Sequence, residues 1–275
     1  MSNWEKVIAE AQLISLPEAF LQLKSVLDQD DFSMAEVAMP ISQDPALTAR
    51  LLRLVNSSFY GFSGKIDTVF RAVTMIGTRQ VYELALATAV TQTFDGMGNR
   101  IIDMPGFWCN SVYCGLAAKN LAKACNLLNS ERLFVAGLLH DIGHLIMYQS
   151  IPELCEQAII LSNESLQPLY LVERDIIGLD YARVGGALAR QWQLPGSLRE
   201  TTEFHVTPEQ SRSFPLETYL VNIAVQLTAI QNGNIEDARF HPDALQQTGL
   251  SLEDCESIMQ QTELEISKVM SSIFP

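Results

Sequence analysis

Apolar residues recur along most of this chain at the three- and four-residue spacing that buries one face of an α-helix. The segment 45–55 is a clear example, because four of its apolar residues share one helical face: Leu47, Leu51, Leu52 and Val55. The segments 215–227 and 252–273 have the same kind of spacing. We find no stretch with the alternation of apolar and polar residues that is typical of β-strands. The pattern therefore predicts an all-α protein.

Residues with capping chemistry mark several of the predicted helix starts. The sequences Ser33-x-x-Glu36 and Ser197-x-x-Glu200 both fit a capping box. Asp44-Pro45 fits an N-cap residue followed by proline at the first helical position. The caps and the apolar spacing together predict a short helix after Ser33 and helices over the ranges 45–55, 69–76, 81–90, 107–128, 133–148, 166–177, 182–192, 197–205, 215–227 and 252–273.

A segment rich in helix-breaking residues separates the chain into two parts. It runs from Asp95-Gly96 to Pro105-Gly106 and contains three glycines and a proline. We expect an N-terminal helical subdomain over residues 1–100 and a second helical subdomain over residues 101–275, which together form one functional unit.

Composition and charge narrow the classes of function. The net charge of −14 at pH 7 disfavours general binding to nucleic acids, whose phosphates such a surface repels. The longest apolar runs are too short to cross a bilayer, and the first residues contain no apolar signal segment. The five cysteines form no CxxC pair and are expected to be reduced thiols. These features predict a cytoplasmic protein without a membrane partner.

The most apolar predicted helix, 133–148, contains ionisable residues at its centre: His140, Asp141 and His144. Burial of such groups without partners is costly, so they need partners. His140 and His144 are four residues apart and would share one face of a continuous helix. Two interpretations remain open from spacing alone. A His-Asp pair can bind a divalent metal ion, or Asp141 can accept hydrogen bonds from histidines that are packed in the core.

The run Leu133 to Gly143 resembles the central helix of the HD superfamily of metal-dependent phosphohydrolases, and the upstream sequence resembles the HDOD family, the HD-related output domains of bacterial signalling. The resemblance covers roughly residues 13–230. It is carried by Leu16-Pro17, Ile41 to Ser57, Tyr60-Gly61, Arg71 to Gly77, Phe107-Trp108, Glu173, Val184-Gly185, Leu188 and Trp192 to Pro195. It implies a multi-helix bundle of the HD-domain, phosphodiesterase-like type with an N-terminal helical subdomain.

The resemblance also implies where metal ligands would lie. The central pair of the superfamily is present as His140 and Asp141. The position of the first ligand histidine is Asn110, and an amide is a poorer transition-metal ligand than an imidazole. The late aspartate that completes a mononuclear site is replaced by Val225, which has no ligand atom. This chain therefore keeps two of the four positions of that site.

Two further positions belong to members of the superfamily with two metal ions. A histidine before the Val-Gly pair is replaced by Tyr181. The two consecutive histidines of these members correspond to Phe204 and His205, so only the second is kept. If any metal binds, the resemblance assigns it to His140, Asp141 and His205. Because a catalytic metal usually has three protein ligands, we expect a degenerate site with no catalytic residue and no cofactor.

The resemblance favours a non-catalytic module of signal transduction that binds protein partners or small ligands, with a nucleotide among the ligands to consider. The surface that we expect to contact a signalling partner includes Arg50, Arg53, Asn56, Ser57 and Tyr60. A simpler interpretation is that Asn56 and Ser57 cap a helix end, and that Tyr60 packs on it.

Two other functions remain as alternatives. The chain could be a metal-dependent phosphohydrolase acting on a nucleotide or cyclic dinucleotide, which requires bound metal and a catalytic role for His140 and Asp141. It could also be a helical nucleic-acid-binding regulator, although the acidic composition opposes this. No sensor or receiver domain is evident in these residues, so we expect the input signal to come from another chain or from a ligand.

Overall fold

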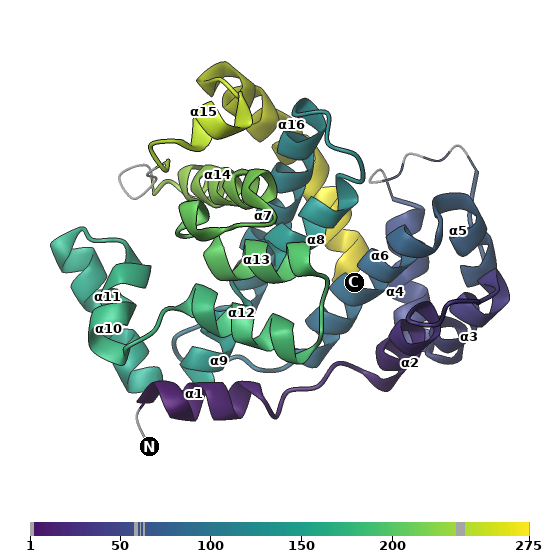
Figure 1. The fold of residues 1–275 in the computed structure, drawn as a ribbon, viewed down its shortest axis with the longest axis horizontal. Helices are drawn as coiled ribbons and strands as arrows, with labels where there is room; N and C mark the ends of the chain where they lie inside the picture. Colours follow the sequence, from purple (N-terminus) through teal and green to yellow (C-terminus); the bar gives the residue numbers. More distant parts are fainter. Residues whose placement is uncertain (1–2, 58–59, 61, 63, 235–239, 275) are drawn as a thin grey trace. The chain divides into compact units, whose positions relative to one another are not determined.

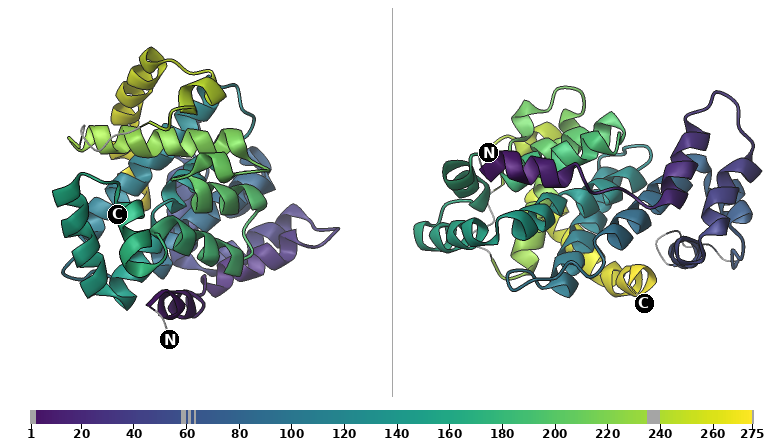
Figure 2. Two further views of the ribbon diagram at one scale, coloured as in Figure 1. Left: turned by 60° about the vertical axis from the view of Figure 1, so that its left-hand side comes forward. Right: turned by 90° about the horizontal axis from the view of Figure 1, so that it is seen from below.

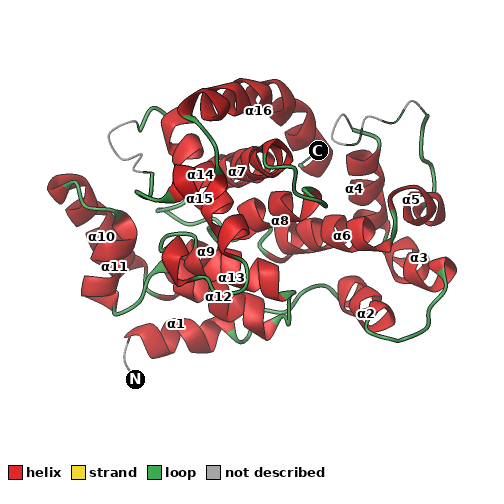
Figure 3. Cartoon of the chain, turned by 45° about the horizontal axis from the view of Figure 1, so that its top comes forward, coloured by secondary structure: helices red, strands yellow, loops and turns green. Residues whose placement is uncertain are grey.

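The computed structural model describes residues 3–57, 60, 62, 64–234 and 240–274 and contains helices and connecting loops (Figure 1). No strand is present in these residues, as the colouring by secondary structure makes clear (Figure 3). The prediction of an all-α protein is therefore confirmed. Within the described part of the chain, no helix is both long enough and apolar enough to cross a membrane.

The chain consists of two compact units. Unit 1 contains Met1–Ile14 and Gly96–Thr262, and unit 2 contains Ser15–Asp95 and Glu263–Pro275. The boundary at 95/96 lies within the expected breaker segment. The units differ from the expected ranges 1–100 and 101–275 at both ends of the chain. At the N-terminus the reason is that α1 (Asn3–Ala11) packs on α9 (Ile142–Ser150) and α12 (Tyr181–Gln191).

Unit 2 is a small helical bundle in which consecutive helices pack on one another. Its helices are α2 (Glu18–Leu27), α3 (Met34–Gln43), α4 (Pro45–Val55), α5 (Val69–Ile76) and α6 (Thr78–Thr93). The most extensive packing is that of α3 on α2 and α5, and of α4 on α6. The final residues of α16 (Leu252–Ile273) also belong to this unit.

Local capping explains two of the helix starts in unit 2. Ser33 accepts a hydrogen bond from the backbone N–H of Glu36, whose carboxylate accepts from the backbone of Ser33, which confirms the first capping box. Asp44 caps α4, and Pro45 is its first residue, also as predicted. One detail of α4 differs, because Leu54 is fully buried whereas Leu52 is only half-buried.

Unit 1 is built around the packing of α7 against α8 (Figure 2). The elements are α7 (Met104–Ala124), α8 (Glu131–Leu139), α9, α10 (Pro152–Ser165), α11 (Leu169–Ile177), α12, α13 (Gly196–Phe204), the short 3-10 turn η1 (Pro208–Gln210), α14 (Pro215–Gln231), α15 (Ala244–Thr248) and the first part of α16. α14 packs on both helices of this pair and α13 packs on α8, whereas α9 packs on α12, and α10 and α11 form a hairpin. The close approach of α7 and α8 depends on glycine, because a Cβ atom on Gly137 would lie 2.6 Å from Cα of Gly115.

The structure corrects two sequence predictions in unit 1. Residues 133–148 do not form one helix, since α8 ends at Leu139 and α9 begins at Ile142. The turn between these helices consists of His140 and Asp141, so the assumption that His140 and His144 share one helical face is wrong. The predicted second capping box is also wrong, because Ser197 lies inside α13, whose N-cap residue is Pro195.

A polar network at the His140–Asp141 turn

The two residues of the His-Asp pair lie in the turn that joins α8 to α9. His140 is 7% exposed, and its Nδ1 donates to the backbone carbonyl of Gly137 over 2.6 Å. Asp141 is the N-cap residue of α9, and its backbone carbonyl accepts from the N–H of His144. The break in the helix therefore places the Asp141 carboxylate beside the imidazole of His144 rather than on a separate face.

His144 is held between two carboxylates. Its Nδ1 forms a short hydrogen bond with Asp141, and its Nε2 lies 2.8 Å from Oε1 of Glu173. Burial lowers the pKa of His144, but the two carboxylates outweigh this effect and raise it to about 10. The imidazole is therefore protonated at neutral pH and donates from both nitrogens.

Both carboxylates form hydrogen bonds with this cation. Burial raises the pKa of Asp141, but the charge and hydrogen bond of His144 outweigh it, so the pKa lies below its usual range. Glu173 on α11 is 1% exposed and also accepts from the backbone N–H of Tyr181 over 3.0 Å. The His144 ion pair thus links α9, α11 and the start of α12.

Tyr181 connects this ion pair to His205. Its ring stacks on the imidazole of His144 with centroids 4.0 Å apart. Nδ1 of His205 donates to the backbone carbonyl of Thr202 over 2.9 Å, and burial, together with the neighbouring His140, lowers the pKa of His205 to about 3. His205 is therefore neutral. Its Nε2 accepts a hydrogen bond from the Tyr181 hydroxyl over 3.0 Å.

His140 completes the cluster. Its ring meets that of His205 edge to face with centroids 5.4 Å apart. Burial lowers the pKa of His140, which keeps this imidazole neutral at neutral pH. The cluster therefore contains one cationic histidine between two anions and two neutral histidines beside them.

These residues do not fit the divalent metal ion that the HD superfamily implies. Within the described residues, no group of three or more His, Cys, Asp or Glu side chains is arranged to hold a metal ion. The imidazole Nε2 of His205 accepts from Tyr181, and Asp141 accepts from the protonated His144. Metal ligands must present free lone pairs. The Nε2 lone pair of His205 is used by Tyr181, and one oxygen of Asp141 already faces a cation.

The other positions of the superfamily pattern have different environments. Asn110 is exposed and accepts a hydrogen bond from Asn232 over 3.1 Å. Val225 lines a cavity next to His205. Tyr181, where the pattern has a histidine, has its hydroxyl bonded to His205.

Sequence reasoning did not identify the role of Glu173. The residue was noted only as part of the family resemblance. It shares a predicted helical face with Leu169, Ile176 and Ile177, and a carboxylate on such a face is a signal that a cationic partner lies nearby. Its partner His144 is 29 positions away in the chain, so spacing could not identify the pair.

The residues expected to contact a partner lie in unit 2 and have different environments. Arg53 is exposed on α4, and Arg50 is half-buried. Asn56 bonds through its side chain to the carbonyl of Leu52 and to both backbone groups of Ile66. Ser57 donates to the carbonyl of Leu54, and these bonds agree with the capping interpretation. Tyr60 stacks on Phe62, with ring centroids 5.9 Å apart.

The sequence profile of the HDOD domain family matches residues 13–208. Among solved structures, a protein of Shewanella amazonensis SB2B that is provisionally named a phosphohydrolase is 24% identical, with a TM-score of 0.78 over 98% of this chain and 97% of the other. A provisionally named signal transduction protein of Marinobacter aquaeolei VT8 is 18% identical, with a TM-score of 0.72 over 98% of this chain and 65% of the other. These two comparisons show a shared fold.

A curated relative is an uncharacterized protein of Treponema pallidum (strain Nichols). It is 26% identical over 192 residues, which represent 69% of this chain and 37% of the relative. The present chain thus matches little more than a third of that protein's length.

Proposed function

Because this chain belongs to the HDOD domain family, we propose that it is a non-catalytic module of signal transduction, which acts by binding a signalling protein or a small ligand. In this proposal the helical bundle of the HD type provides a rigid scaffold, and the His140–Asp141 turn stabilises it. The proposal does not require a bound metal or cofactor.

The observation that carries the proposal is the ion pair of His144 with Asp141 and Glu173. In a two-metal site the carboxylate of the His-Asp pair would bridge both metal ions. Here Asp141 pairs with a protonated imidazole instead. A cation is thus already present beside this carboxylate, and its charge opposes the approach of a divalent ion.

The surface of unit 2 supports a role in protein contacts. The outward side of α5 carries Phe70, Thr74 and Met75, all of which are exposed. Thr74 also contacts Met34 of α3, whose side chain is 47% exposed. Exposed aromatic and methionine side chains that cluster in this way are typical of protein-interaction surfaces. We propose that this surface and the neighbouring α4, with Arg50 and Arg53, contact the signalling partner.

The experiment that tests the non-catalytic assignment is a hydrolysis assay. Wild-type protein is incubated with nucleoside triphosphates and cyclic dinucleotides in the presence of Mg²⁺ or Mn²⁺. Asp141→Asn and His140→Ala variants, purified in the same way, serve as matched controls for contaminating phosphatases. We expect all three proteins to give the same background rate. Turnover in the wild type that both substitutions abolish would establish a phosphohydrolase instead.

A further inference from the structure

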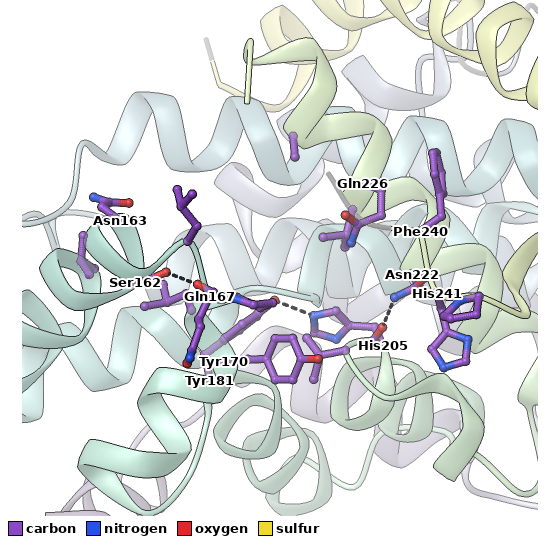
Figure 4. Close-up of a pocket in the computed structure, with 18 residues that line it drawn as sticks. Ser162, Asn163, Gln167, Tyr170, Tyr181, His205, Asn222, Gln226, Phe240 and His241 are labelled. Atoms are coloured by element: carbon purple, nitrogen blue, oxygen red, sulfur yellow. Dashed lines mark hydrogen bonds between the residues drawn. The ribbon is translucent and has the colours of Figure 1, made fainter. Parts of the chain in front are cut away.

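A cavity of about 470 Å³ lies in unit 1 beside the polar network. In the view of Figure 4, the α10–α11 hairpin lies at one end, residues of α14 and the segment 240–242 lie at the other, and Tyr181 and His205 are between them. This volume is within the usual range of small-molecule sites.

The described lining of the cavity is made of apolar, aromatic and neutral polar side chains together with two histidines. None of the eighteen described residues that line it is Asp, Glu, Lys or Arg. These eighteen residues offer no Lys or Arg to pair with a phosphate and no carboxylate to pair with an ammonium group. Burial of an unpaired charge is costly, so these described residues favour an uncharged molecule.

Asn222 supplies an acceptor without a partner. Its Nδ2 donates to the backbone carbonyl of His205 over 2.8 Å, which fixes the orientation of the amide. The other amide atom, Oδ1, is buried and has no hydrogen-bond partner within the described residues. The side chain as a whole is 5% exposed. Buried amide oxygens are normally hydrogen-bonded, so this atom is suited to a donor from a ligand.

Tyr181 provides a second acceptor. Because its hydroxyl donates to Nε2 of His205, the phenolic oxygen keeps lone pairs with which to accept a hydrogen bond. The lining also includes the rings of Tyr170, Phe240 and His241. A ligand that satisfies these groups carries N–H donors on a flat ring that packs against aromatic side chains.

We propose that this cavity binds an uncharged, planar heteroaromatic molecule that carries an amino group. The amino group donates to Oδ1 of Asn222. The inference rests on the proposed non-catalytic function, since it takes the cavity beside the polar network as a site of binding and not of hydrolysis. It goes beyond that function by excluding phosphate as the recognised group.

The test is isothermal titration calorimetry on the full chain with adenine, adenosine, guanosine and cytidine. Purine riboside, which is adenosine without the amino group, and adenosine 5′-monophosphate are the matched probes. We expect at least one amino-bearing probe to bind with saturation. Where adenosine binds, purine riboside binds about tenfold more weakly, and the monophosphate binds no more tightly than adenosine.

Three variants test whether the probes bind in this cavity. Asn222→Leu removes the acceptor and weakens binding about tenfold. Ala229→Trp fills the cavity from a half-exposed position on α14 and abolishes binding even if Asn222→Leu folds poorly. Gln231→Leu changes an exposed amide on the same helix and leaves binding unchanged.

Three results would overturn the inference: no saturable binding of any of the four probes, a monophosphate that binds at least tenfold more tightly than adenosine, or wild-type affinity in Ala229→Trp. Any of them leaves the proposed function intact as long as no nucleotide is hydrolysed. Hydrolysis, in contrast, would contradict the proposed function whichever probe binds.

Discussion

Nε2 of His144 lies 2.8 Å from Oε1 of Glu173, and both side chains are buried. Because the other imidazole nitrogen bonds to Asp141, one protonated histidine joins the turn between α8 and α9 to α11. This ion pair explains how an apolar core accommodates three ionisable groups.

Replacement of Glu173 by leucine should therefore destabilise the protein. Glu173→Leu removes one of two anions around a buried cation, and the loss of one partner from a buried pair typically costs about 3–5 kcal/mol. We expect a decrease of that size in the free energy of unfolding, measured by urea denaturation. Glu164→Leu on the exposed side of α10 is the control and should change stability by less than about 0.5 kcal/mol. Equal effects of the two substitutions would show that the ion pair does not stabilise the fold.

The same ion pair predicts a dependence of stability on alkaline pH. The pKa of His144 is about 10 in the folded protein, compared with 6.5 for an unperturbed histidine. Since the folded state binds this proton more tightly, the contribution is complete below about pH 6.5 and disappears as the pH rises through about 10. Urea denaturation at pH 6, 8 and 10 should show a steeper loss of stability in the wild type than in His144→Gln. Parallel curves for the two proteins would contradict the assignment.

Gly143 is required by the packing of α9 on α12. A Cβ atom at this position would lie 1.9 Å from the backbone carbonyl oxygen of Tyr181. Gly143→Ala should therefore destabilise the fold by about 3 kcal/mol or more, because the backbone cannot move aside without disturbing the network. Gly98→Ala is the matched control, since its nearest contact is at an ordinary 3.4 Å. Thermal melts that do not differ between the two variants would rule out this close packing.

Asn56 offers a test that separates a structural role from partner contact. Its side chain makes hydrogen bonds to the carbonyl of Leu52 and to both the N–H and the carbonyl of Ile66, each over 2.7 Å. Asn56→Ala should lower the free energy of unfolding by about 1–3 kcal/mol. Arg53→Ala, at an exposed position on the same helix, should stay within about 0.5 kcal/mol of the wild type. If Asn56→Ala is as stable as Arg53→Ala, the structural role is wrong, and Asn56 is again a candidate for contact with the partner.

The sequence predicted best the helix ends that are determined by hydrogen bonds between residues close together in the chain. Ser33 and Asp44 cap their helices through hydrogen bonds to backbone groups two or three residues away, and α5 and α16 have the predicted bounds. The capping box predicted at Ser197-x-x-Glu200 does not form, although the local sequence pattern is the same. The helix begins one residue earlier, after Pro195, and the Glu200 carboxylate accepts instead from Ser211 and the backbone that follows it.

The candidate site was predicted only in part, because its arrangement depends on contacts between distant segments. The resemblance identified His140, Asp141 and His205 as its residues. The break of the helix at Asp141 could not be predicted, since α9 is positioned by the close contact of Gly143 with Tyr181 and by the ion pair with Glu173. A run of apolar residues has no feature that indicates these contacts, so the same sequence also fits one continuous helix.

The central claim is that the His140–Asp141 turn is part of a structural network and not a metal centre. The most direct measurement is the metal content of the protein, purified without chelators, by elemental mass spectrometry on wild type and His140→Ala side by side. We expect substoichiometric metal in both proteins. One or two equivalents of a divalent metal in the wild type that are lost in the variant would contradict it and would favour a metal-dependent phosphohydrolase.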